Sequence, residues 1–343
     1  MHDAPQHGPR PLPLFLDMLR EETAASPERR AAALAGLKAY QEAPRRRKTG
    51  LAPVRFRHQR ARLRDYGGTG RPVIFVPSLI NPPFILDLAP QNSFLRWCSE
   101  QGLHPYLLDW GDPTPAAREM DVTAHVERIL LPLIARFDEP PLLVGYCLGG
   151  TLALGAASAA RVAGVALIAT PWHFAGFGGG RAAIGALWDA AKPSCAALGL
   201  VPMEVLQTGF WRLDPARTVS KYEAFGRMEP GSPGWNGFIA LEDWANAGAP
   251  LPYAAGRQLF EEFVGNDLTG RGGWSVAGKP VDPHALRCPA IEFVSLSDRI
   301  VPKESAADLS DRRDLGAGHV GMVVGGRAKA QLWEPLADWL KRA

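Results

Sequence analysis

Residues 145–150 read Gly-Tyr-Cys-Leu-Gly-Gly, between an apolar run at 141–144 and a run of small residues at 151–157. A strand, a tight turn with glycine two positions either side of one residue, and then a helix is the pattern of a nucleophile elbow. The central residue takes a strained backbone conformation, and a Cβ at either flanking position would collide with neighbouring backbone. That central residue is Cys147, where most elbows carry serine. We therefore expect Cys147 to act as a nucleophile.

The composition is that of a globular protein. Of 343 residues, 46% are apolar and 21% are charged, a length that suits one large α/β domain with an insertion or two ordinary domains. The net charge of +3 is too small to indicate nucleic-acid binding. No apolar run approaches the roughly 18 residues that a membrane span needs, and the first residues do not resemble a signal peptide. We therefore expect a cytoplasmic protein.

The four cysteines are far apart in the sequence and form no Cys-x-x-Cys pair. This spacing favours reduced thiols over a disulfide framework or a zinc site, so we expect neither a metal nor a disulfide. A cysteine in an apolar segment is most often a small buried hydrophobe, which is our interpretation of the three outside the elbow. Those three are Cys98, Cys195 and Cys288.

Apolar runs alternate with helix-like segments through most of the chain. The alternation predicts a doubly wound, mostly parallel sheet. Residues 54–66 alternate in polarity and predict an antiparallel hairpin at its edge. The predicted buried strands lie at 73–76, 105–108, 141–144, 164–169 and 290–295, and the helices near 93–101, 122–137 and 328–342.

The sequence divides into an arm, a core in two parts and an insertion. Residues 1–50 predict an arm that is helical from about 14 to 40 and ends in a basic run at 45–48, interpreted as a solvated linker. The core covers 51–170 and 282–343. Between them, about 171–281, the alternation gives way to sequence rich in Gly, Pro and Trp, which we interpret as a cap over the site. Its tryptophans are Trp172, Trp188, Trp211, Trp235, Trp244 and Trp274.

Two residues in the second part of the core complete a candidate triad. A nucleophile elbow is followed along the chain by an acid and then a histidine. Asp298 comes just after the predicted strand at 290–295, and His319 lies in a loop of small residues before the last helix. Loops at the carboxyl ends of the strands line the crevice of an open α/β sheet, so both side chains can reach Cys147.

The expected roles follow from this order. His319 takes the proton of Cys147, and Asp298 orients the imidazole and stabilises its protonated form. The oxyanion hole would use the backbone N–H of Leu148 and, from the loop after 73–76, that of Leu79. Taken alone, His319 would be an ordinary loop histidine and Asp298 a helix cap; the elbow favours the catalytic interpretation of both.

A cysteine nucleophile favours acyl transfer through a thioester. A thiolate that attacks a thioester makes another thioester at little free-energy cost, and transfer of the acyl group to a hydroxyl then runs downhill. Water must be excluded, or the intermediate hydrolyses. Two alternatives stay open: a thioesterase or depolymerase that uses water as the acceptor, and an inactive scaffold that uses the apolar cap for adhesion.

Several stretches together resemble the polyhydroxyalkanoate synthases, whose lipase-like box carries cysteine in place of serine. The resemblance implies an α/β-hydrolase fold with an inserted cap, and it matches Cys147, Asp298 and His319 to the family's acylated cysteine, aspartate and histidine. The family polymerises (R)-3-hydroxyacyl-CoA and releases CoA, so CoA would be a leaving group and no cofactor is implied. The stretches lie at 81–93, 109–111, 145–152, 297–302 and 318–321.

The chain resembles a short, catalytic-domain form of this family. Residues 1–50 are far shorter than the N-terminal domain of the long synthases. Short synthases typically need a second subunit, so the resemblance implies a homodimer or an accessory subunit as partner, besides the hydroxyacyl-CoA substrate and the polyester. It also implies a cytoplasmic location or one on polymer granules.

Overall fold

A computed structural model describes residues 8–45 and 51–343, and the chain forms two compact units. The larger unit comprises Gly50–Val201 and Ala249–Ala343. The smaller unit comprises Met1–Thr49 and Pro202–Gly248. The predicted arm and the middle of the predicted insertion therefore belong to one unit.

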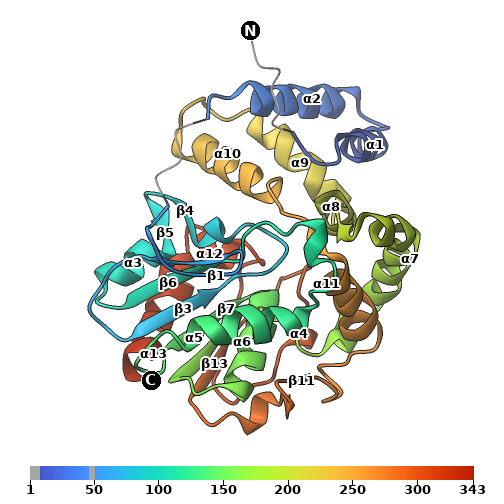
Figure 1. Cartoon of the computed structure of the whole chain (residues 1–343). Helices are drawn as coiled ribbons and strands as arrows, with labels where there is room; N and C mark the ends of the chain where they lie inside the picture. Colours follow the sequence, from blue (N-terminus) through green and yellow to red (C-terminus); the bar gives the residue numbers. More distant parts are fainter. Residues whose placement is uncertain (1–7, 46–50) are drawn as a thin grey trace. The chain divides into compact units, whose positions relative to one another are not determined.

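The larger unit is built on one eight-stranded sheet (Figure 1). The strand order is β1-β2-β6-β3-β7-β8-β13-β14. The first two strands form the predicted edge hairpin, and the five central strands are the predicted apolar runs. The bounds are β1 Val54–His58, β2 Ala61–Asp65, β6 His104–Asp109, β3 Pro72–Val76, β7 Leu142–Tyr146, β8 Gly164–Ile168, β13 Ala290–Ser295 and β14 Arg312–Leu315.

The directions of the strands identify the fold. The hairpin of β1 and β2 is antiparallel, β2 is antiparallel to β6, and all other neighbours are parallel. Next along the chain, β6 pairs with one side of β3, and β7, β8, β13 and β14 then extend the sheet in this order from the other side of β3. This is the α/β-hydrolase fold, as the sequence predicts. The order reverses beside β3 and β7, and ligands of open α/β sheets bind at such a reversal.

Helices pack on the sheet on both faces. On one face, α6 contacts β7 and β8 and also the continuous run of α4, η3 and α5 (in front of the sheet in Figure 1). On the other, Phe94 of α3 packs on Phe75 of β3 and stacks on Trp333 of η8. The bounds are α3 Phe94–Glu100, α4 Val122–His125, η3 Val126–Leu130, α5 Leu131–Ile134, α6 Leu148–Ala159, α12 Gly321–Val324, η8 Lys329–Trp333 and α13 Glu334–Arg342.

Between β8 and β13 the chain leaves the main sheet. The part of this segment in the larger unit comprises α7 (Gly180–Leu198), α11 (Tyr253–Arg257), η5 (Gln258–Gly265) and two small ribbons, β9–β10 and β11–β12. The ribbons are Leu200–Val201 with Leu251–Pro252 and Ser275–Val276 with Lys279–Pro280. A further ribbon, β4 (Asp87–Ala89) with β5 (Asn92–Ser93), lies earlier in the chain. All six tryptophans of the predicted insertion are buried, so they are core residues of their units. That the insertion covers the site stays a prediction.

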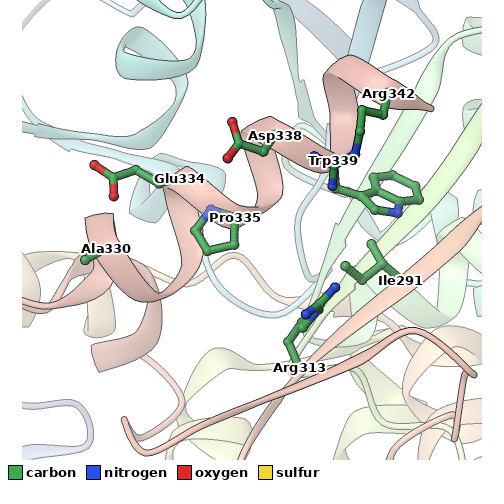
Figure 2. Close-up of a pocket in the computed structure, with 8 residues that line it drawn as sticks. All are labelled: Ile291, Arg313, Ala330, Glu334, Pro335, Asp338, Trp339 and Arg342. Carbon is green, nitrogen blue, oxygen red and sulfur yellow. The ribbon is translucent and has the colours of Figure 1, made fainter.

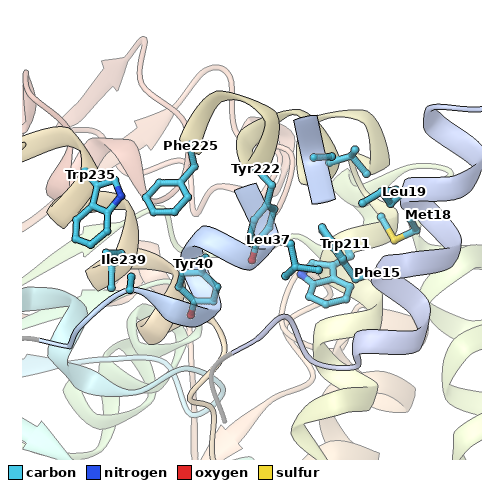
Figure 3. Close-up of a cluster of buried hydrophobic side chains, with 13 residues drawn as sticks. Phe15, Met18, Leu19, Leu37, Tyr40, Trp211, Tyr222, Phe225, Trp235 and Ile239 are labelled. Carbon is cyan, nitrogen blue, oxygen red and sulfur yellow. The ribbon is translucent and has the colours of Figure 1, made fainter. Parts of the chain in front are cut away.

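The smaller unit is helical, and residues far apart in the sequence make its core. Phe15 of α1 packs edge-to-face on Trp211 of α8 and Tyr222 of α9, within the buried cluster of Figure 3. Gly36 lets α2 approach α9 closely, because a Cβ there would lie 1.9 Å from the carbonyl oxygen of Tyr222. The bounds are α1 Leu12–Glu22, α2 Pro27–Glu42, α8 Met203–Arg212, α9 Pro215–Phe225 and α10 Pro233–Ala245.

The arm differs from the prediction in two respects. The stretch predicted to be helical contains two helices, because Ser26 accepts a hydrogen bond from the N–H of Arg29 and caps α2 ahead of Pro27. The basic run is not entirely a solvated linker. Arg45 makes a bidentate ion pair with Asp243, at 2.9 and 3.1 Å, and both side chains are at most 20% exposed. The rest of the run, at 46–48, lies outside the described residues.

Candidate active site

Cys147 lies at a sharp turn between β7 and α6. Its backbone has φ 56° and ψ −133°, a conformation that costs free energy for any residue except glycine. The N–H of Cys147 donates to the carbonyl oxygen of Ile168 in β8 at 2.9 Å, and its own carbonyl accepts from Gly150 at 2.9 Å. The turn therefore places the thiol at the carboxyl edge of the sheet, as in a nucleophile elbow.

The glycines of the elbow leave no room for a side chain. A Cβ on Gly145 would lie 2.2 Å from the Cα of Gly150, and one on Gly149 would lie 2.0 Å from the carbonyl oxygen of Val76. The predicted collision with backbone on both sides of Cys147 is thus confirmed. Gly150, for which the sequence argument had no role, is equally confined, because its Cβ would lie 1.8 Å from the Thr170 hydroxyl oxygen.

The candidate acid and base are in direct contact. His319 Nδ1 donates to Asp298 Oδ2 at 2.6 Å, and both residues are buried. The other carboxylate oxygen, Oδ1, accepts from the N–H groups of Ile300 at 2.7 Å and Val301 at 3.0 Å. Three donors thus hold the carboxylate of Asp298, so its orientation toward His319 is well defined.

The charges around His319 favour its protonated form. Burial lowers the pKa of His319, but the negative charges of Asp298 and Cys147, and hydrogen bonds to both side chains, outweigh burial and raise this pKa. These charges therefore favour an imidazolium at His319, beside the Cys147 side chain. The structure brings the three predicted residues of the triad together; their catalytic roles stay predictions.

The two predicted oxyanion donors lie on neighbouring segments. Leu148 is the first residue of α6, and N–H groups in the first turn of a helix have no acceptor within it. Leu79 is buried in the loop after β3, and the contact of Gly149 with Val76 brings this loop against the elbow. Trp110, which the sequence analysis left without a role, donates to the carbonyl oxygen of Pro77 in the same loop at 3.0 Å.

Two of the three remaining cysteines are buried, as expected, whereas Cys288 is only partly buried. All four cysteines of the chain are free. Cys98 and Cys195 are buried, and burial raises the pKa of both thiols and of Cys288. Their thiolates are therefore disfavoured at neutral pH.

Other observations delimit the site. A surface pocket of about 390 Å³ lies against α13 and the strands β13 and β14 (Figure 2), and no predicted site residue lines it. Within residues 8–45 and 51–343, no group of three or more His, Cys, Asp or Glu side chains is arranged to hold a metal ion. In the same part of the chain, no helix has the length and apolarity to cross a membrane. The pocket residues are Ile291, Arg313, Ala330, Glu334, Pro335, Asp338, Trp339 and Arg342.

The sheet, the elbow and the His319–Asp298 pair define an α/β-hydrolase-fold protein with cysteine at the nucleophile position. No protein-family model matches the chain. Its sequence is nevertheless related to the polyhydroxyalkanoate polymerases, as the motifs indicate. The poly(3-hydroxyalkanoate) polymerase subunit PhaC of Haloferax mediterranei is 30% identical over 286 residues, which cover 78% of this chain and 58% of that protein.

Two further comparisons are similar in extent. The polymerase subunit PhaC of Haloarcula marismortui is 26% identical over 78% of this chain and 60% of its own length. That of Allochromatium vinosum is 25% identical over 78% of this chain and 80% of its own length. The chain thus spans less than two thirds of the first two relatives. Among solved structures, the monoacylglycerol lipase of Paleococcus ferrophilus has a TM-score of 0.49 and 15% identity over 82% of this chain and 98% of that one.

Proposed function

We propose that the chain is an acyltransferase that polymerises (R)-3-hydroxyacyl-CoA through a thioester on Cys147 and releases CoA. The observation that carries this proposal is the cysteine at the elbow, with the His319–Asp298 pair beside it. The relationship to proteins named poly(3-hydroxyalkanoate) polymerases supports the choice of substrate. The CoA portion leaves with the first step, so the proposal includes no resident cofactor.

The first half-reaction loads the acyl chain onto the enzyme. His319 holds the proton of the Cys147 thiol, and the thiolate attacks the carbonyl carbon of the CoA thioester. The N–H groups of Leu148 and Leu79 would stabilise the oxyanion that forms. The bond between that carbon and the sulfur of CoA then breaks, and the leaving thiolate takes the proton from His319. One thioester replaces another, so the step needs little driving force.

The second half-reaction joins two units. The 3-hydroxyl group of one hydroxyacyl unit loses its proton to His319 and attacks the thioester on Cys147. The new C–O bond forms the ester link, the C–S bond breaks, and the Cys147 thiolate is regenerated. Asp298 orients the imidazole and stabilises its cation in both halves. The cap predicted at about 171–281 would exclude water, which competes with the hydroxyl.

A product assay tests the proposal directly. Purified protein supplied with (R)-3-hydroxybutyryl-CoA should release CoA and form insoluble polyester, and Cys147→Ala should abolish both. Cys288→Ala is the matched control and should leave both products unchanged. Soluble 3-hydroxy acid as the main product would show that water is the acyl acceptor, and the protein would then be a thioesterase or depolymerase. A single equivalent of CoA without chain growth would reject polymerisation and retain the acyl-enzyme.

The same assay addresses the partner. From the resemblance to the synthases, we propose that the protein acts as a homodimer or in a complex with an accessory subunit. The assay is therefore run with purified protein alone and again with added host lysate. Polymer that forms only with lysate supports an accessory subunit. Full activity of the purified protein alone would exclude the need for one, and its mass in solution would then distinguish a monomer from a homodimer.

A further inference from the structure

The loop that carries His319 is rich in small residues. It contains glycine at positions 316 and 318, and nothing lies within 4 Å of a Cβ built on either one. Two serines, Ser295 at the end of β13 and Ser297 just after it, donate hydrogen bonds to this loop. Ser297 donates its hydroxyl hydrogen to the carbonyl oxygen of Gly316 at 3.2 Å, and Ser295 donates to that of Ala317. The backbone ahead of His319 is therefore fixed by side chains that precede Asp298.

Tyr146 holds His319 itself. It is the last residue of β7, directly before Cys147, and it is buried. Its hydroxyl group donates to the carbonyl oxygen of His319 at 3.3 Å. Its ring stacks on the imidazole, with the centroids 5.1 Å apart and the planes inclined by 28°. One side chain thus contacts both the backbone and the ring of the candidate base.

The chemistry of the phenol suits this contact. The face of an aromatic ring carries partial negative charge and attracts a cation that lies over it. Burial, followed by the negative charges of Cys147 and Asp298, raises the pKa of Tyr146 well above its usual value. The hydroxyl group therefore keeps its hydrogen and remains a donor to the His319 carbonyl. The ionisable side chains that act on the His319 ring are Asp298 and Cys147, with Tyr146 against its face.

We propose that Tyr146 is a positioning residue for His319. The Tyr146 hydroxyl group holds the backbone of His319, and the Tyr146 ring holds the imidazole and stabilises the imidazolium beside Cys147. The inference rests on the proposed function in that Cys147 is the nucleophile. It does not depend on whether the acyl acceptor is water or a growing polyester.

The test measures how fast iodoacetamide alkylates Cys147, because this reaction reports the thiolate without an acyl substrate. The rate is followed at the Cys147 peptide by mass spectrometry from about pH 5 to about pH 11. Tyr146→Leu removes the ring that stabilises the imidazolium, so His319 should lose its proton at lower pH, and the midpoint at the alkaline end of the rate profile should move downward by about half to one pH unit. Tyr146→Phe keeps the ring and should keep the midpoint, while the rate falls about threefold to tenfold through loss of the hydrogen bond.

Tyr106→Phe is the matched control, since Tyr106 is a buried tyrosine of strand β6, which β3 separates from β7. It should leave rate and midpoint unchanged. Wild-type profiles in both Tyr146 variants would overturn the proposal. If Tyr146→Leu fails to fold, Tyr146→Phe decides alone, and a wild-type rate in it overturns the role of the hydroxyl group. Alkylation of wild-type Cys147 no faster than that of Cys288 would instead contradict the proposed nucleophile.

Discussion

At the scale of single residues, the site is defined by close approaches that only small side chains permit. Cys147 is in a strained conformation, and such a conformation persists only where surrounding structure holds it. The strands on either side supply that support, since β8 accepts the N–H of Cys147 and the backbone after β3 packs on Gly149. Substitutions in the elbow should therefore affect stability as well as catalysis.

Gly149→Ala should destabilise the fold strongly. Its Cβ would lie 2.0 Å from the carbonyl oxygen of Val76, so one backbone segment must move, and we expect a loss of about 3 kcal/mol or more. Urea denaturation measures this change. Gly185→Ala is the control: it lies within α7 with nothing within 4 Å of its Cβ, and it should stabilise by about 0.5–1 kcal/mol. Equal effects of the two substitutions would refute the argument.

The His319–Asp298 pair should make stability depend on pH. The pKa of His319 is raised from 6.5 to about 10 in the folded protein, so folding favours the imidazolium. This contribution is complete below about pH 6.5 and is lost as the pH rises toward 10. Asp298→Asn removes the negative charge that contributes most to the raised pKa. The stability advantage of the wild type over this variant, measured by urea denaturation, should shrink between pH 6.5 and 10. A constant difference would contradict the ion pair.

At the scale of elements, buried and partly buried polar side chains join helices that are distant in sequence. In the smaller unit, the Tyr40 hydroxyl donates to Asp243 at 2.7 Å, beside the bidentate pair of Asp243 with Arg45. These contacts connect the end of α2 with α10. Partly buried pairs that satisfy several donors contribute more than exposed pairs, because removal of one partner leaves the others unpaired.

A double-mutant cycle on Arg45→Ala and Asp243→Ala should therefore give a coupling free energy of about 1–2 kcal/mol. The exposed pair of Arg20 with Asp17, whose side chains are 69% and 59% exposed, is the control in the same unit. It should give less than about 0.5 kcal/mol. Thermal or urea unfolding supplies the four stabilities of each cycle. A coupling free energy between Arg45 and Asp243 that is no larger than the one between Arg20 and Asp17 would show that burial does not strengthen the ion pair.

At the scale of the whole molecule, the chain is two compact units, and the smaller one combines its first 49 residues with Pro202–Gly248. The N-terminal helices are therefore part of a core, with Phe15 fully buried between α8 and α9. An apolar core that spans such a sequence distance orders both segments together.

Phe15→Ala should cost about 3–5 kcal/mol in the stability of the smaller unit. The expected sign is faster amide hydrogen exchange in α9, which Phe15 contacts through Tyr222. Leu16→Ala, on the same helix but 40% exposed, should change exchange little. Protection of α9 that is unaffected by Phe15→Ala would argue that α1 does not belong to this core.

The sequence predicts those parts of the fold that rest on local patterns. The central strands are apolar runs, and the elbow and the order of Cys147, Asp298 and His319 follow from short motifs. β14 was not predicted, because this edge strand reads Arg-Arg-Asp-Leu and carries no apolar run. The break between α1 and α2 had a local signal, Ser26 before Pro27, that the helical pattern obscured.

Contacts between distant residues could not be predicted. Nothing near Tyr146 in the sequence indicates that its hydroxyl group meets the carbonyl of His319, 173 positions later. The same holds for Arg45 and Asp243, 198 positions apart. Such pairs depend on how the whole chain folds, and a single sequence contains no periodicity that reports them.

The order of the site residues along the chain also has a consequence for synthesis on the ribosome. Cys147 emerges well before Asp298 and His319, and its strand β7 can pair with β3 and β8 while the later residues are still untranslated. Throughout that interval the thiol lacks the two side chains proposed to assist it. In the proposed mechanism, acyl transfer through Cys147 therefore starts only after His319 has left the exit tunnel and paired with Asp298.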